Sequence, residues 1–153
     1  MRILYFLFIQ IAFGLCAFSQ SFSYEPPENF IKNQDATVLT FSNSAAGAII
    51  QISTQNTVNF TEFYNTFNRE QFIINGLEII AEDVNIINNV VQHFYFKCKY
   101  TVQQEHEGQI SEFIRIIYFT QNKNALIMAV ASFPLLATEI IQKPIMQSFN
   151  NLK

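Results

Sequence analysis

Cys98 and His93 are residues whose types could form a nucleophile and its general base. They lie five positions apart in a run typical of a β-strand, where odd and even positions face opposite sides, so the two side chains diverge. The same alternation groups Cys98 with Phe94, Phe96 and Tyr100 on an apolar face. We therefore expect Cys98 to be a buried and unreactive thiol.

Two acidic clusters could bind a metal ion or transfer protons: Glu82-Asp83 and the turn Glu105-His106-Glu107-Gly108. Adjacent strand residues face opposite sides, and adjacent residues in a tight turn rarely direct three ligands at one ion. The sequence also lacks G-x-S-x-G, H-E-x-x-H and a glycine-rich phosphate loop. We expect no catalytic residues, no metal site and no cofactor.

A third set of residues could recognise a partner. His93, Tyr95, Lys97, Lys99 and Thr101 share the strand parity opposite to Cys98. Tyr95, Lys97 and Lys99 combine aromatic and basic groups, and they are our candidate residues for docking an acidic or sugar-like partner. The alternative is an ordinary solvated strand face, or one that a helix covers.

The elements that position these residues begin with a β-hairpin. Residues 37–41 and 47–53 have strand character, and the turn-forming segment 43–47 joins them. From Val58 the apolar residues recur three and four apart, which predicts an amphipathic helix that ends before Gly76. Thr57 or Asn59 could cap its start.

Four further strands are predicted after Gly76, at residues 77–87, 90–102, 109–120 and 125–133. Short turn-like breaks separate them, which indicates an antiparallel meander. Residues 126–130 are apolar at nearly every position, so we expect the last strand to be central and covered on both faces.

A closing helix is predicted after Pro134. One broad apolar side holds Leu135, Leu136, Ile140, Ile141, Ile145, Phe149 and Leu152. Pro144 removes a backbone donor, so we expect a kink or a break near Lys143. The order is ββ-α-ββββ-α, which indicates an α+β fold with an antiparallel sheet sandwiched between helices.

Composition is consistent with one apolar-cored domain at residues 20–153. Only 14% of the 153 residues are charged, while 50% are hydrophobic and 17 are Phe, so the interior is apolar and the surface is rich in neutral amides. The formal charge of −3 becomes −4 once Arg2 is removed. Nucleic acid is therefore not an expected partner, because phosphates demand clustered basic residues.

Residues 1–19 are expected to be a cleaved signal peptide. Arg2 precedes an apolar run, and the small residues Ala17 and Ser19 stand at positions −3 and −1 of a cut before Gln20. An uncleaved anchor and lipidation at Cys16 are the alternatives. We expect an exported protein, periplasmic or extracellular, with no stable membrane span after cleavage.

Residues at the joints of these elements resemble the PsbP-like superfamily, which includes a photosystem II extrinsic protein and a nuclear import factor that binds the GTPase Ran. The resemblance covers nearly all of residues 20–153, although the chain lacks Trp and Pro144 interrupts the last helix. The residues that carry it are Tyr24, Pro27 and Phe30, the segment 76–80, the segment 94–96, and Ser148, Phe149 and Leu152.

The resemblance implies a non-catalytic binding or assembly role, with a protein or an envelope component as the partner. Two other classes of function stay open at this point. One is a carrier of small hydrophobic molecules, with a cavity between sheet and helix. The other is a hydrolase that uses unconventional groups such as Tyr95 and Glu112.

Overall fold

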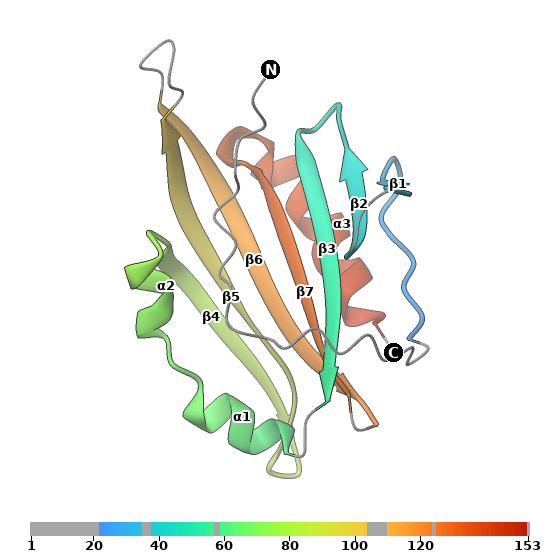
Figure 1. Cartoon of the computed structure of the whole chain (residues 1–153), viewed down its shortest axis with the longest axis vertical. Helices are drawn as coiled ribbons and strands as arrows, with labels where there is room; N and C mark the ends of the chain where they lie inside the picture. The colour runs from blue at the N-terminus through green and yellow to red at the C-terminus, as the bar shows by residue number, and fades with distance from the viewer. Residues whose placement is uncertain (1–21, 35–37, 57–58, 104–109, 124, 153) are drawn as a thin grey trace.

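The structure is a computed structural model that describes residues 22–34, 38–56, 59–103, 110–123 and 125–152. Within these residues lies one antiparallel sheet of seven strands, in the spatial order β1-β2-β3-β7-β6-β5-β4 (Figure 1). The strands are β1 (Ile31–Lys32), β2 (Leu39–Asn43), β3 (Ala48–Asn56), β4 (Glu78–Ile87), β5 (Val90–Gln103), β6 (Ile110–Asn122) and β7 (Ala125–Pro134). The helices are α1 (Phe60–Thr66), α2 (Glu70–Ile74), the 3₁₀ helix η1 (Leu135–Ala137) and α3 (Thr138–Asn150).

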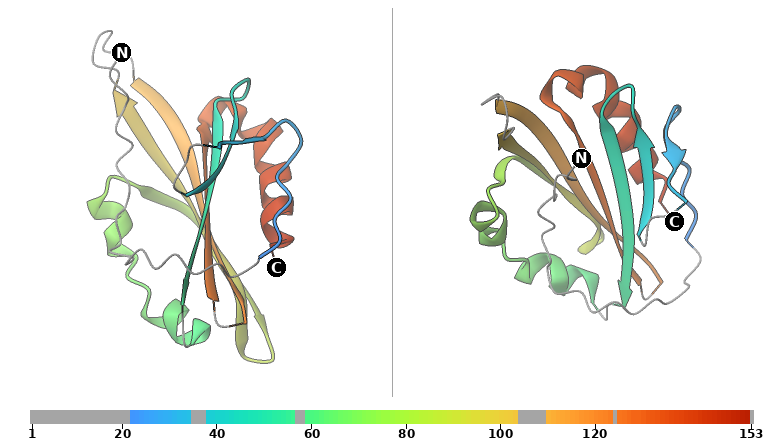
Figure 2. Two further views of the ribbon diagram at one scale, coloured as in Figure 1. Left: turned by 45° about the vertical axis from the view of Figure 1, so that its right-hand side comes forward. Right: turned by 45° about the horizontal axis from the view of Figure 1, so that its top comes forward.

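The helices lie on opposite faces of the sheet, which confirms the α+β class (Figure 2). α1 and α2 pack on one face near β4 and β5, and α3 packs on the other face against β7. β7 is the central strand, as predicted from its apolar run, but the prediction that both of its faces are covered is wrong in part, because Met128 and Val130 are only half-buried on the face opposite α3. The element order differs from the prediction in two respects, because the short strand β1 precedes the hairpin and the first helix is divided.

The division into α1 and α2 occurs at Phe67. Asn59 caps α1 as predicted, because its side chain accepts a hydrogen bond of 3.0 Å from the Glu62 N–H. Phe67 then adopts an extended conformation and ends the helix. Its ring lies 5.5 Å from that of Phe72 and 5.2 Å from that of Phe96. Packing of this ring into the core therefore accompanies a break that helical periodicity alone did not predict.

Of the predicted kink or break near Lys143, the break is wrong, because α3 is one helix from Thr138 to Asn150. Ile141, Ile145 and Phe149 are buried against the sheet, and this packing holds the helix together on both sides of the proline. The predicted apolar side is also too broad. Leu136 is 96% exposed and Ile140 79% exposed, so these two side chains face away from the core.

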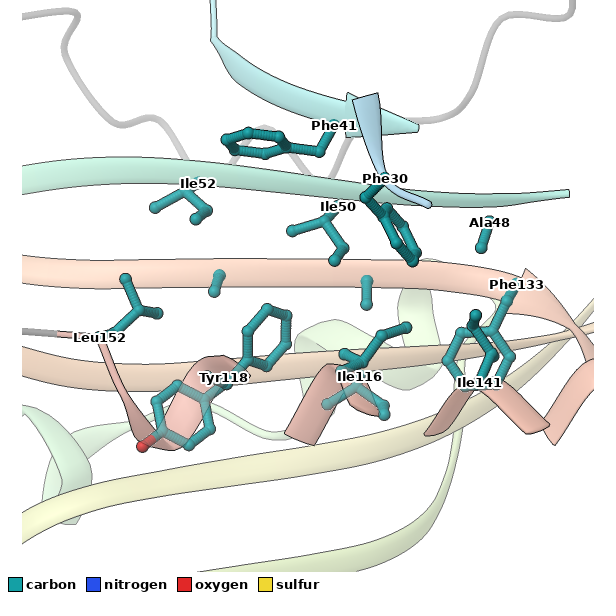
Figure 3. Packing of buried hydrophobic residues seen from close by; sticks show 14 of the residues in the cluster. Phe30, Phe41, Ala48, Ile50, Ile52, Ile116, Tyr118, Phe133, Ile141 and Leu152 are labelled. Atoms are coloured by element: carbon teal, nitrogen blue, oxygen red, sulfur yellow. The ribbon is translucent and has the colours of Figure 1, made fainter. Parts of the chain in front are cut away.

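Two apolar clusters fill the spaces between the sheet and its helices. On the α3 face, Ile50, Ile116, Tyr118 and Phe133 pack with α3 (Figure 3). On the α1–α2 face the cluster is mainly aromatic and contains Phe60, Phe72, Phe94, Phe96 and Phe119. These opposite clusters define which face each strand residue occupies.

The N-terminal lead-in packs aromatic side chains against the body of the protein. Phe30 is buried, and Tyr24 lies edge-on to Phe41 with ring centroids 5.3 Å apart. The Tyr24 hydroxyl is 3.0 Å from the Ser148 hydroxyl on α3. Residues of the lead-in and of the closing helix, which both contribute to the family resemblance, are therefore direct neighbours.

The connecting turns follow their residue types. Asn88 and Asn89 both have positive φ angles, 51° and 62°, as a two-residue hairpin turn requires. Gly47 has φ 61°, and a Cβ there would lie 3.3 Å from Pro134 Cγ, so both conformation and space favour glycine. The predicted signal peptide and the turn at 105–108 lie outside the described residues.

Candidate functional site

Tyr95, Lys97 and Lys99 lie on one face of β5, and we call these three residues the β5 strip. They stand directly opposite Tyr118, Ile116 and Ile114 on β6. The three β6 residues belong to the apolar cluster beneath α3. The strip therefore shares the α3 face of the sheet, while Phe94 and Phe96 occupy the opposite face, in agreement with the predicted alternation.

The strip is half open. The buried side chains of α3 pack with residues of β3, β6 and β7, whereas β5 and β4 lie towards one edge of the sheet. Asp83 and Asn85 on β4 are exposed, whereas Tyr95 and Lys97 on β5 are half-buried. The alternatives considered from sequence were a solvated face and a helix-covered face, and this part of the sheet combines features of both.

The two lysines of the strip differ in their electrostatic surroundings. Lys99 forms an ion pair with Glu112, which raises the pKa of Lys99. Lys97 instead stands opposite Ala81 on β4 and Ile116 on β6, and the described residues place no carboxylate in ion-pair contact with it. Lys97 is therefore the lysine of this strip that forms no ion pair with the described residues.

Tyr95 and the neighbouring His93, on the same face of β5, both pack against apolar or aromatic side chains. Tyr95 packs against the edge of the apolar cluster, and its burial, with a smaller effect of Asp83, raises the pKa of its hydroxyl. His93 stacks on Tyr118 with ring centroids 5.3 Å apart. Burial lowers the pKa of His93, which favours the neutral imidazole at pH 7.

Cys98 is buried on the face opposite to His93, as predicted. Its exposed fraction is 0%, and its neighbours include the aromatic side chains of the α1–α2 face. Burial raises the pKa of the Cys98 thiol to about 12, although the nearby Arg115 opposes the shift. The thiol is therefore protonated at neutral pH and has no access to the imidazole.

Native Cys98 is expected to resist alkylation. At pH 8 a bulky maleimide should label the folded protein at least 100-fold more slowly than the urea-unfolded protein, because the thiol is both buried and protonated. Cys98→Ala should lower the free energy of unfolding by about 1 kcal/mol. Labelling at equal rates in the two states, measured by mass spectrometry, would show that the thiol is accessible.

The other candidate groups do not converge. Glu82 is held by Arg69, with 3.0 Å between Arg69 Nε and Glu82 Oε2, whereas Asp83 lies on the opposite face. Tyr95 and Glu112 share a face, but Glu112 stands opposite Thr101, six residues or about 20 Å along the strand from Tyr95. The described part of the chain holds no group of three His, Cys, Asp or Glu side chains placed for a metal ion.

The aromatic cluster bears on the carrier alternative. The ring of Phe94 lies 4.8 Å from Phe119, 5.8 Å from Phe96 and 5.9 Å from Phe63, measured between centroids. These are contact separations for aromatic side chains. The rings therefore fill the space between the sheet and α1.

One polar group was missed in the sequence. Arg115 lies on the α1–α2 face of β6, where its Nε donates a hydrogen bond of 3.0 Å to the Ser132 hydroxyl. Its guanidinium lies 4.7 Å from the centre of the Tyr100 ring. The sequence does contain a sign of this group, because Arg115 is a charged residue within the otherwise apolar run 113–117, and charged side chains are rarely buried without a partner.

No helix in the described part of the chain has the length and apolar character needed to cross a membrane.

Sequence comparison gives no match to a protein-family model and none to a curated protein. Structural comparison does. The Ran-binding protein Mog1p of Saccharomyces cerevisiae superposes with a TM-score of 0.56 at 12% identity, over 86% of this chain and 89% of Mog1p.

Two further solved structures match over similar shares. The cyanobacterial PsbP protein CyanoP of Synechocystis sp. PCC 6803 has a TM-score of 0.51 at 11% identity, over 86% of this chain and 85% of CyanoP. LpqN of Mycobacterium tuberculosis, a protein involved in cell envelope biogenesis, has a TM-score of 0.53 at 6% identity, over 87% of this chain and 82% of LpqN. The chain therefore has the PsbP/Mog1 fold that its sequence resemblance implied.

Proposed function

We propose that residues 20–153 form an exported, non-catalytic binding or assembly domain that recognises a protein or envelope component through the β5 strip. The observation that carries this proposal is that Tyr95 lies beside Lys97, which forms no ion pair with the described residues, on a half-open part of the sheet. Tyr95 supplies apolar contact area and Lys97 supplies charge. An acidic site on the partner surface fits both.

The fold neighbours support a binding role in general terms. Mog1p is a Ran-binding protein, and LpqN is involved in cell envelope biogenesis. Their identities to this chain, 12% and 6%, place no particular partner on it. The partner must therefore be found by experiment.

Export has a direct test that is independent of binding. The protein purified from its native source should begin at Gln20 when its N-terminus is read by mass spectrometry. Recovery of intact Met1 in a soluble cytoplasmic fraction would contradict export, and a lipid on Cys16 would identify a lipoprotein instead.

Binding should depend on Lys97 more than on Lys99. With a partner cross-linked and purified from the native envelope, Lys97→Gln is expected to weaken affinity about tenfold at low salt, because it removes the uncompensated charge. Lys99→Gln should have a smaller effect, because the Lys99 ammonium is already paired with the Glu112 carboxylate. Affinity would be measured by calorimetry over a salt series, in which the loss should shrink as salt rises.

The matched control is Lys32→Gln, an exposed lysine on β1 at the opposite edge of the sheet. It should leave affinity unchanged. If the folded triple variant Tyr95→Ala, Lys97→Ala, Lys99→Ala binds as tightly as the parent, the β5 strip is not the binding surface.

A further inference from the structure

The second half-open surface lies on the other face of the sheet, around Arg115. Register places Arg115 between Cys98 on β5 and Ser132 on β7, and Ile49 on β3 follows next in the same row. α1 and α2 pack over the Phe94 and Phe96 part of this face. Ile49, Gln51, Met128 and Val130, on β3 and β7, are only half-buried.

The guanidinium of Arg115 is held in place without being neutralised. The Ser132 hydroxyl accepts a hydrogen bond from Arg115 Nε, and the guanidinium packs over the Tyr100 ring. Tyr100 is itself stacked on Phe113, with ring centroids 5.5 Å apart and an angle of 22° between the planes. Among the described residues, the structure records no acceptor for the terminal nitrogens of Arg115 and no carboxylate in ion-pair contact with it.

Arg69 provides a comparison, because its guanidinium is paired with a carboxylate. It also lies against aromatic rings, Tyr64 and Phe96, but donates from Nε and from a terminal nitrogen to the Glu82 carboxylate. Arg115 has the same aromatic support, but among the described residues no carboxylate is in ion-pair contact with it.

We propose that Arg115 is the anchor of a second docking surface, which binds an acidic segment of a partner protein through one carboxylate. A guanidinium fixed through Nε can offer its two terminal nitrogens to both oxygens of an Asp or Glu side chain. Val130 lies two residues from Ser132 on the adjacent strand β7, and Ile49 lies opposite Ser132 on β3, so apolar side chains beside the carboxylate complete the fit. The proposal goes beyond the β5 strip and does not depend on it.

Charge favours a carboxylate segment over a phosphate surface. Nucleic acids and anionic lipid surfaces are bound by clusters of basic residues. Here one arginine stands among apolar and neutral side chains, which suits a single negative charge next to apolar groups. Contact with such a segment would also exclude water from the ion pair, which strengthens it.

The experiment uses 12-residue peptides displayed on phage and selected on the purified mature protein. Selected peptides should be enriched in Asp or Glu flanked by aromatic or branched apolar residues. Synthetic copies of these peptides should bind Arg115→Gln at least tenfold more weakly than the parent protein. Arg115→Lys should recover only part of the affinity, because lysine keeps the charge but not the two-pronged geometry.

Matched variants and mapping separate the two surfaces. Lys97→Gln and Lys32→Gln should bind the peptides as the parent does, and amide shifts in the parent should centre on Ser132, Ile49 and Val130. The proposal is overturned if the selection yields no acidic enrichment, if folded Arg115→Gln keeps full affinity, or if the shifts centre on Lys97. Because the shifts are measured on the parent protein, this test holds even if Arg115→Gln fails to fold. If the Arg115 proposal fails this test, the proposal for the β5 strip still stands, because the two surfaces lie on opposite faces of the sheet.

Discussion

Replacing Phe94 with alanine is expected to lower the free energy of unfolding by about 3–5 kcal/mol, among the largest effects of a single substitution in this protein. Phe94 is fully buried, and its ring contacts those of Phe60, Tyr64, Phe67 and Phe119 at centroid separations of 4.8–5.9 Å. The substitution removes apolar area and leaves a cavity bounded by rings from α1, from Phe67 after it and from β6. Urea unfolding followed by far-UV circular dichroism would measure the loss.

The matched control for this prediction is Leu136→Ala. Leu136 is 96% exposed, so truncation should change the free energy of unfolding by less than about 0.5 kcal/mol. A loss below about 1 kcal/mol for Phe94→Ala would contradict the packing described for the aromatic cluster. A loss of similar size in both variants would contradict the assignment of Leu136 to the surface.

Replacing Pro144 with alanine is expected to raise the free energy of unfolding by about 1–3 kcal/mol. α3 continues through Pro144, where the ring lacks a backbone donor and crowds the carbonyl four residues earlier, that of Ile140. Alanine restores the donor and has the highest helix propensity. The gain should appear as a higher urea midpoint with an unchanged slope.

The neighbouring exposed Lys143 provides the control, because Lys143→Ala alters propensity only slightly and removes no buried contact. It should change stability by less than about 0.5 kcal/mol. A destabilised Pro144→Ala variant would mean that the half-buried proline ring contributes more through packing than it costs through the backbone.

The strands were predictable because their signals are local. Period-two alternation and turn residues located β2 to β7 within a few positions, and the apolar run 126–130 predicted that β7 is central. Asn59 was correctly named as a possible cap of α1. The helices were less predictable, because the break at Phe67 and the continuity at Pro144 both depend on contacts with the sheet.

For the candidate surface, the sequence predicted only which face of β5 each side chain occupies. Strand parity alone indicated that Tyr95, Lys97 and Lys99 share a face and that Cys98 faces away. It did not indicate that Glu112 compensates Lys99 while Lys97 lies between apolar neighbours. Arg115 was missed for the same reason, since its partners Ser132 and Tyr100 are on other strands.

The alternation of residues on each strand, the positions of the turns and the apolar interior can be read from the amino-acid sequence, because these properties depend on residues close together in the chain. Which halves of the two sheet faces the helices cover became clear only from the folded protein. Helix placement depends on packing between segments far apart in sequence, such as α3 with β3, β6 and β7. That placement leaves Lys97 and Arg115 on half-open parts of opposite faces, so the surroundings of Lys97 and the whole Arg115 surface became visible only in the fold.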